Sequence, residues 1–590
     1  MTRKAFCLDR IEEQDFPTEE CLSFQDIQKN PDTITNIRLW DNRPLKDVYN
    51  QIQSIRGYYE FNDVDIDRYT VDGQYRQVML SARELVQGKL PANAQTWVNQ
   101  RLQYTHGYGA VMSPVNEITT EGLPNLFLQD VPPRGKLPLD RPEIYFGEKT
   151  TGNVIVNTGA KEFDFPKGDE NVQTQYQGKG GVALDSYFKK LVFASQFGAP
   201  NILFTNYITS ESRILYFRNI KERVQRVVPF LLLDNDPYLV VADGRLSWIQ
   251  DAYTYTDKYP YSQPFQDRLN YIRNSVKVVI DAYDGTMSLY VADPNDPLIV
   301  TYSAIFPGLF TPMGQMPASL ASHVRYPEDL FKVQVEMYRA YHMRDANVFY
   351  NKEDLWKVPN EIFDTKEQPV EPYYVIMRIP GQPKEEFVLM IPFTPPNKDN
   401  IIAWLAARSD GADYGKLLVF KFPKDRLIYG PMQIEARIDQ DPTISGQFTL
   451  WNQGGSRIIR GNTLVIPIEK SNLYVEPIYL QAEKSRMPEL KRVITATGNK
   501  LVMETTLQES LAKLFGQQPA TPLPGAPPTT APPPAAPGAQ LPGTAASLVQ
   551  SARQHYNAAQ DALKNGNWAK YGDEIKAMEQ DLARLEELTR

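Results

Sequence analysis

Short apolar runs separated by Pro, Gly and Asp recur along most of this chain, and they predict strands more often than long helices. The clearest case is residues 276–292, where Asp284-Gly285 joins two β-branched and aromatic runs. Glycine adopts positive φ without strain, so this stretch is predicted to be a hairpin. Further strands are expected at residues 58–75, 201–216, 374–379, 386–391, 416–420, 432–438, 463–468, 473–481, 492–496 and 500–504.

Apolar residues spaced three and four apart predict helices between these strands. In residues 218–228 the apolar side chains share one face. Residues 327–342 begin with Pro327-Glu328-Asp329, a combination that suits the first turn of a helix and its dipole. Other helices are expected at residues 45–55, 92–102, 397–407 and 507–515.

A Pro/Ala/Gly-rich stretch over residues 516–545 excludes helix and sheet and predicts a disordered, extended linker. After it, residues 546–590 carry two apolar stripes at helical spacing, separated by Asn565-Gly566-Asn567. Gly566 suits the left-handed end of one helix and Asn567 the N-cap of the next, so an antiparallel helical hairpin is predicted. A lone hairpin buries little, so we expect it to dock on the body or on a partner.

These elements predict an α+β fold with β-rich, mixed or antiparallel sheets and peripheral helices. We expect five segments along the chain: an irregular lead-in (1–45), a first α+β subdomain (46–265), a second, β-rich subdomain (266–515), the linker (516–545) and the hairpin (546–590).

Composition narrows the class of protein. The chain has 590 residues and a formal net charge of −8, which argues against a nucleic-acid partner because phosphate binding needs a basic face. Its uninterrupted apolar runs are too short to cross a bilayer. Cys7 and Cys21 are the only cysteines; they are either free thiols or a pair across a short loop.

His106 is the best candidate for a catalytic group. It lies in a Gly-flanked turn, and Glu117 is close enough in sequence to orient it as a general base. The alternative is a buried histidine that holds the turn together, since no nucleophile motif accompanies it. Zinc-site spacings, a phosphate-binding loop and a nucleophile elbow are all missing from the sequence.

Two further kinds of site are conceivable. Asp234 and Asp236, and likewise Asp281 and Asp284, are carboxylate pairs in turns that suit a calcium ion, although Asp more often caps turns. The basic residues Arg213, Arg223 and Arg226 would suit an anion such as a lipid headgroup, a phosphate or an acidic glycan, although such residues more often pair with acids on a solvated face.

The sequence resembles the uncharacterised protein family UPF0182. The matching stretches are residues 36–41 (NIRLWD), 104–109 (YTHGYG), 144–148 (IYFGE), 229–231 (PFL), 234–238 (DNDPY), 248–254 (WIQDAYT), 271–277 (YIRNSVK), 281–285 (DAYDG), 323–331 (HVRYPEDLF), 464–469 (LVIPIE), 474–477 (YVEP) and 566–572 (GNWAKYG). Cys7 departs from the family pattern, which has a small residue there, and the family carries no assigned catalytic residues.

The resemblance implies a bacterial membrane protein with an N-terminal bundle of transmembrane helices followed by a large extracytoplasmic domain. This chain is expected to be that domain, with Met1 as an added start and residues 1–45 closest to the membrane. The function expected is a non-enzymatic extracytoplasmic binding or scaffold domain at the cell membrane, with an envelope protein, a lipid or glycan ligand, or a second copy as partner. No cofactor is expected apart from the calcium considered above. The alternative is a hydrolase or transferase that acts on an envelope substrate through His106 and nearby acids.

Overall fold

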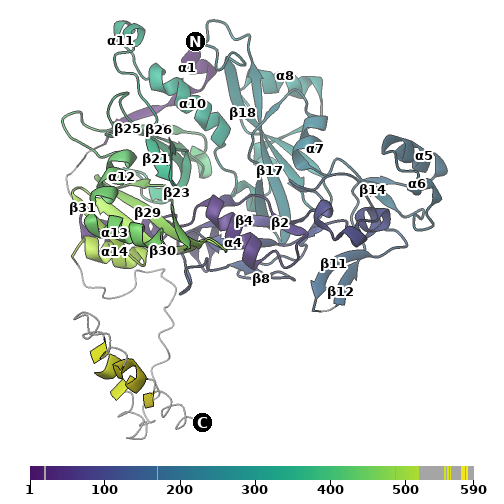
Figure 1. Cartoon of the computed structure of the whole chain (residues 1–590). Coiled ribbons are helices and arrows are strands. Elements are labelled where there is room, and N and C mark those ends of the chain that lie inside the picture. Colours follow the sequence, from purple (N-terminus) through teal and green to yellow (C-terminus); the bar gives the residue numbers. More distant parts are fainter. Residues whose placement is uncertain are drawn as a thin grey trace. The chain divides into compact units, whose positions relative to one another are not determined.

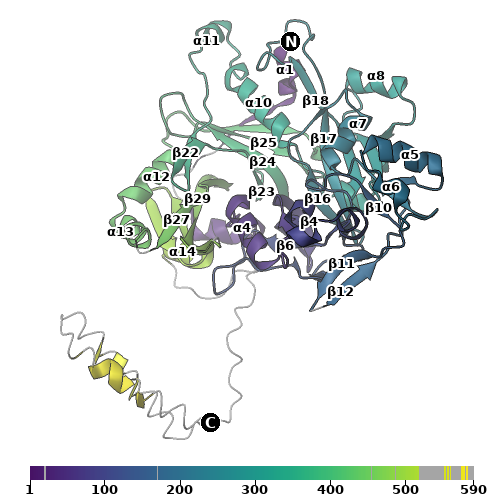
Figure 2. The same ribbon diagram turned by 45° about the vertical axis from the view of Figure 1, so that its right-hand side comes forward.

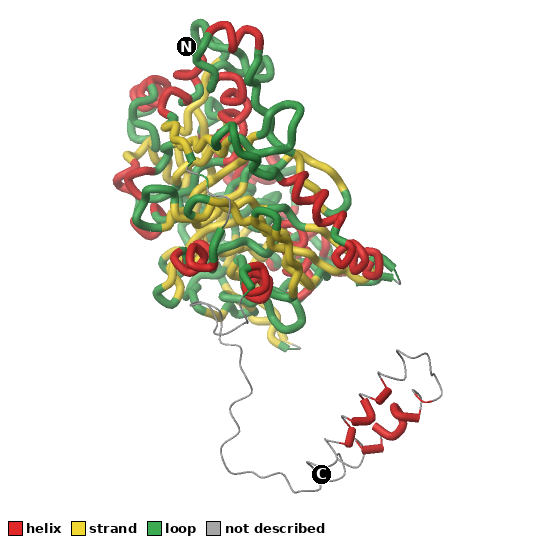
Figure 3. Tube along the Cα trace, turned by 90° about the vertical axis from the view of Figure 1, so that its left-hand side faces the viewer, coloured by secondary structure: helices red, strands yellow, loops and turns green. Residues whose placement is uncertain are grey.

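The computed structural model describes residues 1–16, 18, 22–168, 170–453, 455–485 and 487–516, together with helical positions between 551 and 581 (Figure 1). The chain forms two compact units, Met1–Gly525 and Ala526–Arg590. The first unit is α+β, as predicted, with strands in the interior and most helices toward the outside (Figure 3). Cys7 is free of a disulfide, and Cys21 lies outside the described residues.

One sheet joins the start of the chain to its middle. Its strand order is β1 (Glu12–Asp15), β26 (Leu417–Lys421), β25 (Ala403–Arg408), β24 (Glu385–Phe393) and β23 (Tyr373–Arg378). β1 runs parallel to β26, whereas the other neighbours are antiparallel. The expected irregular lead-in therefore contributes a strand to the body.

A second sheet follows in sequence and is accompanied by helices. It consists of β27 (Ser456–Arg460), β29 (Ser471–Ala482), β30 (Glu489–Thr497) and β31 (Lys500–Glu504), with β28 (Leu464–Ile468) also paired to β29. The helices nearest in sequence are α12 (Pro431–Gln440), α13 (Pro442–Trp451) and α14 (Leu507–Leu514). In Figure 2 these elements form one side of the unit, and the first sheet lies next to them.

Two more sheets build the other side. One contains β15 (Leu232–Leu233), β16 (Tyr238–Ala242), β17 (Arg245–Thr256), β18 (Tyr271–Asp281), β19 (Met287–Val291) and β20 (Phe310–Pro312). The other contains β2 (Tyr59–Phe61), β3 (Asp65–Val71), β4 (Gln74–Leu85), β6 (Ala110–Pro114), β7 (Leu128–Gln129) and β8 (Arg134–Gly135). The boundary expected at residue 265 falls in the loop between β17 and β18, which are neighbours in one sheet, so the two expected halves share that sheet.

Helices and a side lobe complete the first unit. The other α-helices are α1 (Thr2–Ala5), α2 (Phe24–Lys29), α3 (Pro31–Ile34), α4 (Asn42–Ile52), α5 (Tyr187–Gln196), α6 (Asn201–Phe204), α7 (Ile220–Val227), α8 (Pro297–Ile305), α9 (Ala318–Ala321), α10 (Glu328–Tyr341) and α11 (Ala346–Asn351). The lobe that carries α5 and α6 projects beside the ribbon of β11 (Glu162–Lys167) and β12 (Glu170–Thr174) (Figure 1).

Two large apolar cores stabilise this arrangement. The first draws on residues from Ala5 to Leu514, so the ends of the first unit are buried in one cluster. At its centre the rings of Trp404 and Phe420 stack with centroids 4.4 Å apart. The second core lies among the β3–β4–β6 and β16–β17–β18 strands and contains the buried Trp248.

Most of the predicted elements are confirmed, including the 276–292 hairpin and the helices at 218–228, 327–342 and 507–515. Four assignments are wrong, and the fourth is the helix expected at residues 92–102. Residues 432–438 are helical, because Pro431 suits a first helical position and the Gln433 side chain caps the Gly430 N–H. Residues 397–402 are loop, and residues 403–407 belong to strand β25, since this alanine-rich part is buried and tertiary burial overrides helix propensity. Residues 201–216 begin as helix α6.

The expected helix at 92–102 is instead broken into a turn, Ala92–Ala94, and a short helical stretch, Asn99–Gln103. In the second unit, helical positions lie on both sides of the predicted turn, and His555 Nδ1 lies 2.7 Å from Glu574 Oε2. The turn itself, most of the second helix and nearly all of the expected linker fall outside the described residues.

A buried ion pair in the β17–β18 hairpin gives a test of the fold. The ammonium of Lys277 pairs with Asp251, and neither side chain is exposed by more than 2%. Lys277→Met should lower the free energy of unfolding by about 3–5 kcal/mol, because Asp251 would be left as an uncompensated buried charge. Lys258→Met, in an exposed pair with Asp257, should change it by less than about 1 kcal/mol. Urea unfolding checks both variants; equal losses would mean that burial does not strengthen the Lys277 pair.

Candidate functional site

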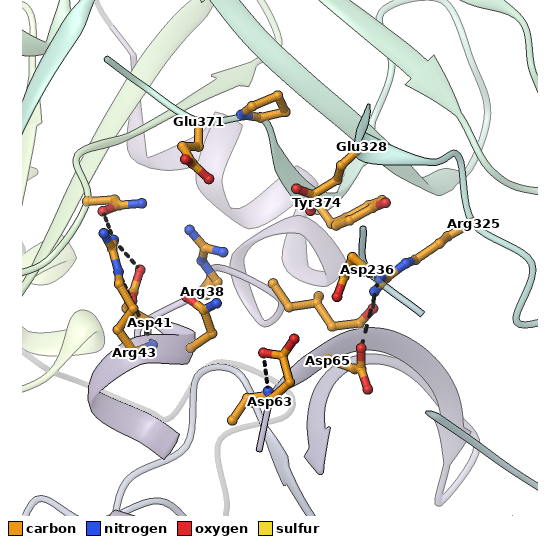
Figure 4. A pocket seen from close by; sticks show the side chains of 15 residues that line it. Arg38, Asp41, Arg43, Asp63, Asp65, Asp236, Arg325, Glu328, Glu371 and Tyr374 are labelled. Atoms are coloured by element: carbon orange, nitrogen blue, oxygen red, sulfur yellow. Dashed lines mark hydrogen bonds and ion pairs between the residues drawn. The ribbon is translucent and has the colours of Figure 1, made fainter. Parts of the chain in front are cut away.

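A pocket of about 270 Å³ opens where distant parts of the first unit meet (Figure 4). Its lining comes from the start of α4, the start of β3, the β15–β16 loop, the start of α10, the start of β23 and the β27–β28 loop. The charged residues among these are Arg38, Asp41, Arg43, Asp63, Asp65, Asp236, Arg325, Glu328 and Glu371. Only the folded chain brings these side chains together.

The first wall is basic. Asp41 is the N-cap of α4 and accepts the Arg43 backbone N–H at 2.9 Å. The Arg43 guanidinium donates to both Asp41 carboxylate oxygens, at 2.7 and 3.0 Å, and to Asn462 at 2.7 Å. It also lies 3.1 Å over the ring of Phe363. Arg43 is therefore fixed and neutralised by contacts within the protein.

Arg38 differs from Arg43 in having no such contacts. Only 9% of the surface of Arg38 is exposed, and its guanidinium points into the pocket (Figure 4). Within the described part of the chain it forms neither a hydrogen bond nor an ion pair. Glu371 points toward the same space from the rim but is paired with Lys332 at 3.7 Å. Buried cations are normally paired. Because Arg38 has no partner among the described residues, its N–H donors are left to face the pocket space.

An acid lies near Arg38 without contacting it. Glu361 is buried, and burial raises the pKa of its carboxyl group to about 7, although a hydrogen bond from Gln368 and the charges of Arg38 and Arg43 oppose this. Arg38 therefore lies near a carboxyl group that burial makes harder to ionise, and it contacts no carboxylate directly.

The second wall is acidic and is organised by Arg325. The Arg325 guanidinium pairs with Asp236, donates to the Ile66 carbonyl at 3.0 Å and lies 4.1 Å from the ring centre of Tyr238. Asp65 accepts the Leu239 N–H at 2.9 Å through Oδ2. Its Oδ1 is buried without a hydrogen bond among the described residues and lies 3.9 Å from Arg325.

Crowding of acids changes their ionisation. Burial, with repulsion from Asp236 next, raises the pKa of Glu328 to about 7. Burial raises the pKa of Asp236 to about 6, although Arg325 opposes the shift, and Asp63 adds to it. Burial and then Asp236 raise the pKa of Asp65 well above its ordinary value. Near neutral pH this wall would be stabilised by any added cation or hydrogen-bond donor.

His106 lies elsewhere, and its ring has no exposed surface. Its Nδ1 is 2.8 Å from Thr105 Oγ1, and its Nε2 is 3.3 Å from Asp164 Oδ1. Burial alone lowers the His106 pKa, but hydrogen bonds to Asp164 and Glu162 outweigh it and raise the pKa to about 9. The acids beside His106 are therefore Glu162 and Asp164. This geometry is that of a buried histidine held in a turn.

Glu117, the predicted orienting acid, has other partners. Arg76 donates to its Oε1 at 2.6 Å, and Asn125 donates to its Oε2 at 2.7 Å. The structure thus gives Glu117 a buried ion pair of its own and does not join it to His106.

The first predicted calcium pair is divided between two networks. Asp234 caps a turn by accepting the Asp236 N–H at 2.8 Å, and it also accepts the Tyr253 hydroxyl and the Asp329 N–H. The Asp236 side chain turns instead to Arg325 in the pocket. Of the predicted site residues, Asp236 alone lines the pocket.

The second pair also caps a turn. Asp281 accepts the N–H groups of Tyr283 and Asp284 at 2.9 and 2.7 Å and pairs with Arg245 at 2.8 Å. Asp284 accepts the Tyr176 hydroxyl at 2.7 Å. Among the residues that the structure describes, no group of three or more His, Cys, Asp and Glu side chains is placed to hold a metal ion. These contacts lend the calcium prediction no support.

The three arginines of the predicted anion site do not come together. Arg213 and Arg223 each donate through Nε to a backbone carbonyl at 2.7 Å. Arg226 lies 3.8 Å from Glu222 on the exposed side of α7. All three have structural partners, whereas the largely buried Arg38 forms no hydrogen bond or ion pair among the described residues.

Sequence reasoning missed Arg38, Asp65 and Arg325, and gave Glu328 only the role of a helix-start acid. Arg38, Asp236, Arg325 and Glu328 do occur in stretches that carry the family resemblance, at 36–41, 234–238 and 323–331. Those stretches are far apart in sequence, and no local spacing of residues predicts that they come together in one pocket.

Comparison with known proteins identifies relatives. A family model described as an uncharacterised protein family (UPF0182) matches residues 1–451. A UPF0182 protein of Pelotomaculum thermopropionicum is 54% identical over 99% of this chain and 64% of its own length. UPF0182 proteins of Desulforamulus reducens and Trichodesmium erythraeum are 52% and 49% identical, over 63% and 65% of their lengths. The chain thus spans a little under two thirds of these relatives. No solved structure matches it.

The raised pKa of Glu328 predicts how stability depends on pH. Between about pH 4.5 and 7 the folded state holds a proton on Glu328 that the unfolded state has released, so this stabilisation is full below that range and lost as pH rises through it. The free energy of unfolding should fall by about 2–3 kcal/mol from this group between pH 4.5 and 8. Glu328→Gln should flatten that fall, while the exposed Glu211→Gln should not.

Urea unfolding at several pH values measures the effect. Profiles of the wild type and the Glu328→Gln variant that fall in parallel would show that Glu328 is not the group responsible.

Proposed function

We propose a function for this chain, which belongs to the uncharacterised protein family UPF0182: it is a binding domain on the extracytoplasmic side of a cell-envelope membrane protein. Its charged pocket is the binding site for a small ligand that carries an anionic group. The observation that carries this proposal is the buried Arg38 guanidinium, which faces the pocket without a hydrogen bond or an ion pair among the described residues.

The chemistry of Arg38 indicates the group that it would bind. A guanidinium presents five donors in a planar fork that matches a carboxylate or a phosphate, and such charge-assisted contacts are about twice as strong as neutral hydrogen bonds. Holding a buried cation without a countercharge costs stability, which a stable fold tolerates where function requires it. An incoming anion would relieve that cost.

The pocket volume limits the size of the ligand. At about 270 Å³ the pocket has room for several water molecules. Pockets for drug-sized molecules are typically about 300–1,000 Å³. The volume therefore favours a small metabolite or a single headgroup over a polymer chain.

The proposed membrane location rests on observations other than the pocket. The resemblance implies an N-terminal membrane bundle, and the relatives are longer than this chain. Residues 297–322 contain no Asp, Glu, Lys, Arg or His, and α8 exposes the apolar side chains of Val300 and Ile305. In Figures 1 and 2, α8 lies at the same end of the first unit as the N-terminus. An uncharged, apolar surface there is what a membrane-facing end would be expected to carry. Among the described residues, no helix is long and apolar enough to cross a bilayer.

Other expectations have less support. The hydrolase or transferase alternative depended on His106, whose ring is fully buried outside the charged pocket. A scaffold role, a homo-oligomer and docking of the C-terminal hairpin stay predictions.

The variant Arg38→Met separates a binding residue from a structural one. It should abolish stabilisation of the protein by small anions, and it should leave the unliganded protein as stable or more stable by about 1–2 kcal/mol, because a buried uncompensated cation is removed. Thermal unfolding with phosphate, acetate and succinate measures both effects. The matched control is Arg134→Met, in an exposed pair with Asp130, which should change neither.

A loss of more than about 2 kcal/mol in unliganded Arg38→Met, with no anion that stabilises the wild type, would assign Arg38 to the fold and refute the binding proposal.

A further inference from the structure

The two walls of the pocket carry opposite charges (Figure 4). We infer that the ligand is a small zwitterion whose anionic group binds Arg38 and whose ammonium group binds the acidic wall of Asp63, Asp65, Asp236 and Glu328. This inference rests on the proposed function and adds the class of ligand to it.

The acidic wall has more acids than nearby cations. Three of its four carboxyl groups pair with two cations, Arg325 and Lys332, and Asp63 pairs with neither. Arg325 is divided between Asp236, the Ile66 carbonyl and the more distant Asp65. Lys332 is divided between Glu328 and Glu371, at 3.7 Å from each. A further cation in the pocket would complete this set of charges.

Asp65 provides the independent sign that something is missing from this wall. The residue is 5% exposed, and its Oδ1 atom is buried without a hydrogen-bond partner among the described residues. A buried acceptor left unsatisfied costs about 1–3 kcal/mol, and more when it is charged. Arg38 on the basic wall also forms no hydrogen bond or ion pair among the described residues, although its guanidinium nitrogens are open to the pocket rather than fully buried. The pocket thus has one unsatisfied acceptor and one unsatisfied cation on opposite sides.

The spacing of the acids favours an organic cation over a metal ion. Across the described ranges, no three His, Cys, Asp or Glu side chains converge closely enough to hold a metal. An ammonium group has three donors and can reach separate carboxylates, whereas a metal needs its oxygen ligands at about 2.0–2.6 Å. The ring of Tyr374 also lines the pocket and already lies 5.1 Å from the Arg325 guanidinium. An aromatic face of this kind attracts cations.

Two kinds of zwitterion share this chemistry. An amino acid joins an ammonium to a carboxylate, and an ethanolamine phosphate headgroup joins an ammonium to a phosphate. Both fit a volume of about 270 Å³, and a guanidinium accepts either anion.

Two series of related compounds test the inference by removing one charged group at a time. The carboxylate series is 4-aminobutanoate, butanoate and butylamine; the phosphate series is O-phosphoethanolamine, ethyl phosphate and ethanolamine. Isothermal titration calorimetry of the purified chain measures binding. In one series the zwitterion should bind at least about tenfold more tightly than either singly charged compound, since each charge-assisted contact contributes on that scale. The series that binds identifies the anion.

Three variants assign the groups to their walls. Arg38→Met should remove the advantage that the zwitterion has over the amine but keep its advantage over the anion. Glu328→Gln should remove the advantage that the zwitterion has over the anion but keep its advantage over the amine. Asp65→Asn should give the same result as Glu328→Gln, and it replaces that variant if Glu328→Gln folds poorly. Circular dichroism confirms folding.

The outcomes separate the two proposals. If the anion alone binds as tightly as the zwitterion, and binding depends on Arg38, the zwitterion inference is overturned and the anion site stands. If the amine alone binds as tightly, with no effect of Arg38→Met, the anion site is overturned. If none of the six compounds binds at millimolar concentration, both proposals are overturned.

Discussion

The Arg325 guanidinium is the contact on which the charged pocket depends. It reaches Asp236 from the β15–β16 loop, the Ile66 carbonyl of β3, and the rings of Tyr238 in β16 and Tyr374 in β23. These segments belong to three different sheets. A buried guanidinium must satisfy its donors, so Arg325 fixes the relative positions of elements whose apolar packing alone would leave some freedom. The start of α10 follows Arg325 closely in the chain, and the charge of Arg325 opposes the rise in the Glu328 pKa.

Elsewhere in the molecule the same constraint is met with protein partners. Arg68 pairs with Asp67 and Asp410, and Arg460 pairs with Glu435 and Glu476, each largely buried. Removing one partner from such a pair leaves a charge in a low-dielectric interior, which is why they are kept together. Arg38 departs from this rule in a pocket whose other wall has more acids than cations. That contrast, rather than the pocket's size or shape, is what identifies the site.

Much of the fold could be predicted from the sequence, because hairpins and amphipathic helices depend on neighbours in the chain. The β18–β19 hairpin and α10 are examples. Residues 403–407 and 432–438 were assigned wrongly because their local patterns fit both helix and strand, and burial and capping decided between them. The site could hardly be predicted at all. His106 stood out because glycines surround it, yet its ring is buried; Arg38 lies in an ordinary apolar run, and its lack of a partner exists only after folding.

The most direct test of the central claim is an experimental structure of the purified chain at high resolution, with any co-purified compound kept bound and identified by mass spectrometry. The account predicts density in the pocket for a small molecule, with anion oxygens about 2.7–2.9 Å from the Arg38 guanidinium and an ammonium group within hydrogen-bond reach of Asp65 or Glu328. An Arg38 side chain turned away from the pocket, or paired with a carboxylate of the protein itself, would contradict it.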